Sequence, residues 1–186
     1  MTKRLRFLTA ADDRLDDVGV VLRIRAVAVE LPDLPPPRFA AIELVWSDGP
    51  EPEPGPDAIE VTVEEVVLRG ADRLDALRAG DGPVFTMVSV ARRNPALSRA
   101  ELAERWRAEA GRLGSEAIPD DVRGLAYVQD HPLDDAAPFD AINECWFDTV
   151  DGLRRRADWF ASRPVPADLF DPDECFALYL RVEPAR

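Results

Sequence analysis

Residues 139–148 read Phe139-Asp140-Ala141-Ile142-Asn143-Glu144-Cys145-Trp146-Phe147-Asp148. The run is typical of a buried strand, yet it carries an ionisable group, Glu144, near its centre. It also has a counterpart a hundred positions earlier, because residues 39–48 have the same amino acid at five positions: the Phe, the second Ala, the Ile, the Trp and the final Asp. Internal repetition of this kind decides architecture, so the interpretation of the chain begins with it.

The second half of the chain shows the regular order β-α-β-β-α-β. Residues 83–91 form a nearly continuous apolar strand, and Ser98 begins a helix with Glu101 at the capping-box spacing. The other elements expected here are strands over 123–131, 139–147 and 174–183, and a helix capped by Asp148 or Thr149 with Leu153, Ala157 and Phe160 on its buried face. This order is the ferredoxin-like split arrangement.

The first half repeats the same strand order with weaker helices. Strands are expected over 4–10, 25–31, 39–47 and 58–69, and a short helix over 12–23. A proline-rich loop at 48–56 stands where a second helix would follow. Residues 70–80 are expected to form a helix that links the two halves.

The repeat predicts an α+β protein made of two ferredoxin-like halves, residues 1–81 and 82–186. A four-stranded sheet with helices on one side must bury its other face. Two such sheets packed face to face would do so, giving an internal pseudo-dimer, an α+β barrel, with a cavity between the sheets. A further homodimer through other surfaces remains open.

Composition excludes several classes of partner. The formal net charge of −13 disfavours nucleic acid and anionic membranes. No apolar run approaches the roughly 20 residues of a membrane span, and we expect a soluble, cytoplasmic protein. The two cysteines, Cys145 and Cys175, are expected as buried free thiols, although neighbouring strands could bring them together.

Several motifs of the second half together resemble one known family. They are Arg92-Arg93-Asn94-Pro95-Ala96-Leu97-Ser98, Leu102 and Trp106 on the following helix, residues 124–131, and residues 139–148. In this order and spacing they resemble the EthD family of dimeric α+β barrel proteins. The family usually has a histidine one turn after the helix tryptophan, where this chain has Ala110, so a helical histidine role is lost.

The resemblance implies chemistry without a cofactor on a small, apolar, oxygenated molecule, such as a lyase, decarboxylase, cyclase or oxidative tailoring step. The residues of the sequence also indicate that no cofactor is bound. A single histidine excludes zinc sites with two or three histidines, so no metal is expected. No phosphate-binding glycine loop and no Gly-x-Ser-x-Gly elbow are present.

Alternation along residues 139–147 separates two faces. The face with Asp140, Ile142, Glu144 and Trp146 should line the cavity, whereas the small and apolar residues of the other face suit packing under helices. In the first copy the cavity-lining tryptophan is Trp46, and Leu44 stands where the second copy has Glu144.

Glu144 is the candidate general acid or base, because burial would raise its pKa toward working pH. The alternative is a structural acid bonded to a neighbouring Tyr or Arg. Tyr127 and His131 share one face of their strand and could line the cavity with Glu144, as catalytic partners. His131 could instead be an exposed turn residue.

Four residues are candidates for substrate binding: Asp140, Trp146, Arg92 and Trp46. Arg92, at the end of a strand, could hold an anionic substrate or could be a solvated charge. The run Arg154-Arg155-Arg156 on the second helix is expected to be a solvated face. The sequence therefore favours an enzyme that acts on a small-molecule ligand in the barrel cavity. The open alternative is a non-catalytic small-molecule-binding or structural barrel protein.

Overall fold

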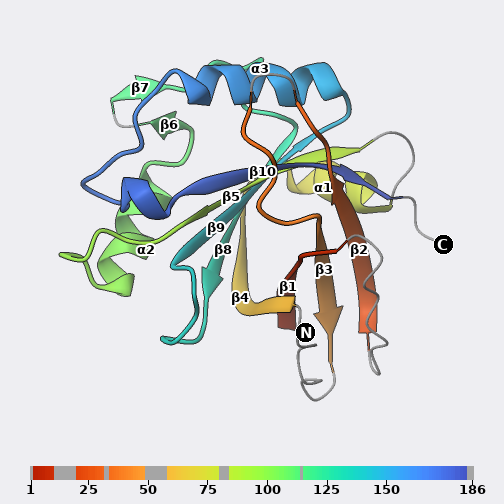
Figure 1. The fold of residues 1–186 in the computed structure, drawn as a ribbon, viewed down its shortest axis with the longest axis horizontal. Helices are drawn as coiled ribbons and strands as arrows, with labels where there is room; N and C mark the ends of the chain where they lie inside the picture. The colour runs from red at the N-terminus through yellow and green to blue at the C-terminus, as the bar shows by residue number, and fades with distance from the viewer. Residues whose placement is uncertain are drawn as a thin grey trace.

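Eight strands close one antiparallel barrel in the computed structural model, which describes residues 2–10, 20–31, 34–48, 58–79, 84–113 and 115–183 (Figure 1). Around the barrel the strands follow one another in the order β1–β3–β2–β10–β5–β9–β8–β4. Their bounds are β1 (Thr2–Leu8), β2 (Val20–Ala28), β3 (Ala41–Ser47), β4 (Ala58–Arg69), β5 (Phe85–Ala91), β8 (Ala126–Pro132), β9 (Ala141–Phe147) and β10 (Phe176–Val182).

Three helices accompany the described strands: α1 (Ala71–Ala79), α2 (Arg99–Ala108) and α3 (Val150–Ala161). Helix α2 begins with the predicted capping box, in which Ser98 and Glu101 bond each other reciprocally, and Thr149 caps α3. In Figure 1, α3 lies across the top of the barrel, α2 to its left and α1 to its right. The short elements are β6 (Arg112–Leu113), β7 (Glu116–Ala117) and the 3₁₀ turn η1 (Pro172–Glu174).

The predicted fold class, two ferredoxin-like α+β halves packed face to face, is wrong. The strands of both parts instead join edge to edge, because β4 pairs with β8 and β2 pairs with β10. Strand β4 makes this possible through its length: residues 58–63 pair with β1, and residues 63–69 pair with β8. Closure leaves none of the eight described barrel strands at a sheet edge, and their apolar faces meet inside one barrel.

Two expectations for the first half fall partly or wholly on residues outside the described ranges. The helix expected over 12–23 is wrong for its last four residues, which belong to strand β2, and residues 12–19 are not among those described. Most of the proline-rich loop and the expected boundary between residues 81 and 82 also lie outside them. Strand β4 and helix α1 are confirmed within a residue of their predicted bounds.

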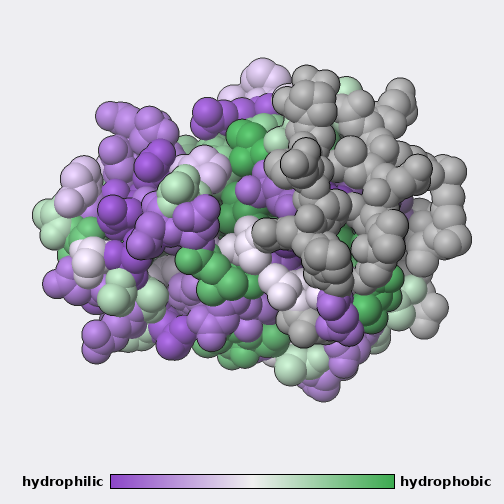
Figure 2. Space-filling model, turned by 90° about the horizontal axis from the view of Figure 1, so that it is seen from below, coloured by the Kyte–Doolittle hydropathy of each residue, from purple (hydrophilic) through white to green (hydrophobic). Residues whose placement is uncertain are grey.

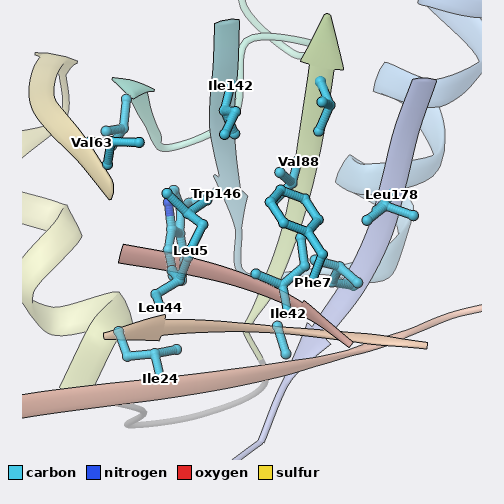
Figure 3. Close-up of a cluster of buried hydrophobic side chains, with 14 of the residues drawn as sticks. Leu5, Phe7, Ile24, Ile42, Leu44, Val63, Val88, Ile142, Trp146 and Leu178 are labelled. Carbon is cyan, nitrogen blue, oxygen red and sulfur yellow. The ribbon is translucent and has the colours of Figure 1, made fainter. Parts of the chain in front are cut away.

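The barrel interior is filled by apolar side chains that alternate along every strand. Figure 3 shows Phe7 of β1 beside Val88 of β5 and Leu5 of β1 beside Trp146 of β9, with Leu178 of β10 in the same cluster. Trp46 and Trp146, the tryptophans of the sequence repeat, both belong to the same cluster. An eight-stranded barrel is just wide enough for side chains to fill it, so this interior is a packed core.

The outer face of strands β5, β8, β9 and β10 is covered by α2 and α3. Leu153 of α3 packs against Cys145 and Phe147, whereas Leu102 and Trp106 of α2 pack against Ala141. Both cysteines are free, as predicted; Cys145 is buried and Cys175 is half-buried. The space-filling view in Figure 2 shows a face on which hydrophilic residues surround separate apolar patches. Within the described ranges, every helix is too short or too polar to cross a membrane.

Candidate functional site

Glu144 lies inside the barrel, as predicted, but it is part of a closed cluster of charges. Its Oε1 is 2.5 Å from Lys3 Nζ, and its Oε2 accepts a hydrogen bond from Trp146 Nε1 at 2.8 Å. Lys3 also donates to Asp130 Oδ1 at 2.9 Å and to Glu65 Oε1 at 2.5 Å. Lys3, Asp130 and Glu144 are each at most 3% exposed. The cluster is therefore a buried ionic network at one end of the core, in which Lys3 contacts three acids and Asp130 Oδ2 has no hydrogen-bond partner in the described ranges.

Arg78 of helix α1 completes this cluster. Its guanidinium makes two hydrogen bonds to Glu65, at 2.5 and 3.2 Å, and lies 4.5 Å from the ring centroid of Trp46. It lies 5.8 Å from the ring centroid of Trp146. The structure thus brings together three of the predicted site residues, Glu144, Trp146 and Trp46, around two cations that the sequence interpretation did not include.

The pKa values of the two fully buried acids of the cluster are shifted in opposite directions. Burial alone would raise the pKa of Glu144, but Lys3 and Arg78 outweigh it and lower that pKa. Burial raises the pKa of Asp130 well above its ordinary value, and the nearby Glu144 charge adds to the rise. These directions favour a proton on Asp130 rather than on Glu144; with that proton in place, the charges of Glu65 and Glu144 balance those of Lys3 and Arg78.

Glu65, Asp130 and Glu144 also have the spacing of a metal site, since one ligand atom from each lies within 4.8 Å of the others. Lys3 Nζ, however, bonds all three carboxyl groups. An ammonium group therefore supplies the positive charge that a cation would bring, and the donor set fits Lys3 better than an added ion.

Tyr127 and His131 do not join Glu144. In the β8–β9 pair, Val128 is opposite Glu144 and Tyr127 is opposite Cys145, so the odd-numbered residues of β8 face outward. His131 packs its ring against Trp106, with ring centroids 5.2 Å apart. Burial, followed by the charge of Arg107, lowers the pKa of His131. The expectation that these residues share a cavity with Glu144 is wrong, because their side chains point to the other side of the sheet.

Asp140 and Arg92 lie at the far end of β9 from Trp146. Asp140 accepts hydrogen bonds from Arg99 Nε at 2.9 Å and from Arg93, through both its backbone N–H and its side chain. Arg92 Nε lies 3.9 Å from Asp140, and its side chain is about half exposed. These contacts connect the end of β5 with α2 and β9. The structure therefore does not bring Asp140 or Arg92 to the predicted cavity.

A cleft of about 310 Å³ lies on the outer face of the sheet, between β5, β8, β9 and β10 and the two covering helices. Its floor includes one row of registered neighbours, in which Ser89 of β5 lies between Ala177 of β10 and Asn143 of β9. These side chains are small, and they leave space beneath α3. Trp106 and Phe160 contribute apolar walls from α2 and α3.

Polar groups converge on the end of this cleft at Tyr127. The Tyr127 hydroxyl accepts hydrogen bonds from Asn143 Nδ2 at 3.4 Å and from Gln129 Nε2 at 3.5 Å. Burial raises the pKa of Tyr127, so the phenol keeps its proton and can donate it. Arg69 and Arg156 line the same cleft.

Arg69 reaches the outer face because of a β-bulge. The register of β4 against β8 shifts between Val67 and Arg69, which sets Arg69 opposite the outward-facing Tyr127. Gly70 follows with φ of 70°, and a Cβ there would lie 2.1 Å from the carbonyl oxygen of Leu125. Only glycine allows this close approach of the chain after β4 to the chain before β8, so Gly70 fixes the position of Arg69.

Arg156 is buried at 3% exposure, so the expectation that Arg154, Arg155 and Arg156 form a solvated face is wrong for this residue. Helical spacing could have shown this, because Arg156 lies three residues after Leu153 and four before Phe160, on the face already expected to be buried. Two other missed residues also carried a signal: Lys3 continues the apolar alternation of Leu5 and Phe7, and Glu65 that of Val61 and Val63.

Comparison of the chain with models of known protein families and with curated proteins gave no match.

Proposed function

We propose that this protein binds a small, largely apolar molecule in the outer cleft between the sheet and helix α3. The observation that carries the proposal is the cleft itself, about 310 Å³ in volume, with small residues on its floor and a few polar groups at one end. This combination is typical of small-molecule sites, in which apolar walls supply affinity and a few polar groups fix orientation.

A binding role has better support than the expected enzyme in the barrel interior. Glu144 has no exposed surface, and its pKa is lowered by Lys3 and Arg78. A general acid or base needs a pKa near working pH and contact with the substrate, and Glu144 has neither property. The enzymatic role and the relationship to the EthD family stay predictions; of the two functions considered from the sequence, non-catalytic binding is the one proposed here.

The experiment is a titration of the purified protein with 1-aminoanthracene, a neutral fluorophore whose emission rises in apolar surroundings. We expect saturable binding. Ala177→Phe, which fills the floor of the cleft, should weaken it by at least about tenfold, or about 1.4 kcal/mol. Ala76→Phe is the matched control, because Ala76 is exposed on α1, away from the residues that line the cleft.

Thermal unfolding of each variant verifies that it is folded, and Ser89→Val serves as a second floor variant if Ala177→Phe does not fold. Absence of saturable fluorophore binding to the wild type would refute the proposal. Equal affinities for the Ala177→Phe and Ala76→Phe proteins would refute the assignment to this cleft.

A further inference from the structure

Among the described residues, the buried arginines outside the cleft pair with acids, whereas Arg156 in the outer cleft does not. On the outer face of strands β1 to β4, Arg6 pairs with Glu60 and Arg25 pairs with Glu43 at 2.7 Å. At the end of the core, Arg78 pairs with Glu65 at 2.5 Å. Arg156 is buried to the same degree, yet no described carboxylate forms an ion pair with it. Its Nη1 donates to the carbonyl oxygen of Val122 at 3.2 Å, and its guanidinium lies 4.4 Å from the ring centroid of Phe160. Its Nε has no hydrogen-bond partner in the described ranges.

Arg69 likewise has no acidic partner among the described residues. Its Nη2 donates to the carbonyl oxygen of Arg123, its Nε has no partner in the part of the chain that is described, and no described acid pairs with it. Burial, followed by the charges of Arg156 and Arg123, lowers the pKa of Arg69. Two guanidinium groups thus repel each other in a partly desolvated site, in a chain with a net charge of −13. A buried charge without a partner is costly, so an anion would relieve this arrangement.

We propose that the ligand of the outer cleft is an apolar monocarboxylate, whose carboxylate is bound by Arg69 and Arg156. This inference rests on the binding function proposed above. The guanidinium group suits a carboxylate because its N–H groups match the two oxygens of the anion. The hydroxyl of Tyr127, which already accepts two side-chain hydrogen bonds, has its own proton to donate to the same anion.

The remaining charges of the cleft support this choice. Glu109 is the one acid among the described lining residues, whereas Arg112, Arg123 and Arg163 add positive charge at the rim. Arg123 is paired with Asp120 at 3.3 Å and Arg163 with Glu116 at 2.7 Å. Arg112 is exposed at the rim and donates to the carbonyl oxygen of Ser115 at 3.0 Å, so the unpaired positive charge next to the apolar floor is that of Arg69 and Arg156. A molecule with a single anionic group and an apolar body satisfies both parts of the cleft.

The test is displacement of 1-aminoanthracene by two probes with the same apolar body and different polar ends, the anion 4-phenylbutyrate and its neutral amide, 4-phenylbutyramide. We expect the carboxylate to displace the fluorophore from the wild type at a concentration about tenfold lower than the amide. Arg156→Met should remove this preference, with the displacement by each probe compared at the fluorophore affinity measured for the same variant. Arg155→Met, on the neighbouring exposed position of the same helix, should keep it.

Arg69→Met provides a second variant, with the same expected loss of preference, if Arg156→Met does not fold. Equal displacement by the two probes from the wild type would overturn the inference and leave the proposed function standing. A preference retained in both Arg69→Met and Arg156→Met would overturn it as well, as would displacement by inorganic phosphate at lower concentration than by 4-phenylbutyrate. Absence of fluorophore binding to the wild type would overturn both proposals together.

Discussion

Tyr127 and Glu144 lie on adjacent strands but project from opposite faces of the sheet, because Tyr127 is registered against Cys145 and Glu144 against Val128. The sequence interpretation combined them in one catalytic cavity. Because the two side chains lie on opposite faces of the sheet, the polar residues of the second half form two separate groups. Glu144 belongs to a neutral ionic cluster inside the core, and Tyr127 belongs to a cleft beneath the helices.

Glu144→Gln should destabilise the fold. The substitution leaves Lys3 without one of its two ionised partners in the core, and breaking a buried ion pair costs about 3–5 kcal/mol. Urea unfolding of Glu144→Gln and of Glu104→Gln, an exposed control on α2, measures the difference. The folded variant should bind 1-aminoanthracene as the wild type does. Unchanged stability together with lost binding would contradict the structural role.

Asp130→Asn should cost much less than Glu144→Gln near neutral pH, because the raised pKa of Asp130 favours its protonated form and the amide keeps the oxygen that accepts from Lys3. The raised pKa of Asp130 gives the wild type a contribution to stability that is complete below the unfolded pKa of about 3.9. This contribution is lost as pH rises through the raised folded pKa. The variant lacks it, so its stability relative to the wild type should improve with rising pH.

Unfolding free energies of the wild type and Asp130→Asn across a pH series test this sign. A decrease in the unfolding free energy of the variant relative to that of the wild type as pH rises would contradict the prediction. Asp130 would then be ionised in the folded protein, and the neutral cluster described above would be wrong.

His131 should titrate below the ordinary value of about 6.5, because it is buried against Trp106 and lies near the positive charge of Arg107. A depressed pKa supplies stability above the unfolded value that is lost as pH falls through the folded value. His131→Phe keeps an aromatic ring against Trp106. This variant should not show the decrease in stability that the titration of His131 causes as pH falls. Since the chain has one histidine, its ring signals in an NMR titration give the pKa directly. A value at or above 6.5 would contradict the buried, neutral ring.

Local sequence patterns predicted well those features that depend on the residues of a single strand or helix. The capping box at Ser98, the strand at 58–69 and the two faces of the strand at Glu144 follow from spacing within one segment. The partner of each strand does not follow, since a period-two pattern does not say which edge pairs with which. The closure of the barrel through β4–β8 and β2–β10 was therefore missed.

The outer cleft was missed for two physical reasons. The bulge between Val67 and Arg69 moves one side chain to the other face, and no residue type marks it. The cleft also depends on the small size of Ser89 and Ala177 beneath α3, which has meaning only when the register that sets them side by side is known. Arg156, by contrast, could have been placed from helical periodicity.

The most direct test of a ligand site outside the barrel uses the four tryptophans, each of which gives its own indole N–H signal in a ¹H–¹⁵N NMR spectrum. Trp106 lines the outer cleft, whereas Trp46 and Trp146 are buried inside the barrel. Saturation with 4-phenylbutyrate should shift the signal of Trp106 and leave those of Trp46 and Trp146 in place. Shifts of Trp46 and Trp146 with an unmoved Trp106 would contradict the outer cleft as the binding site.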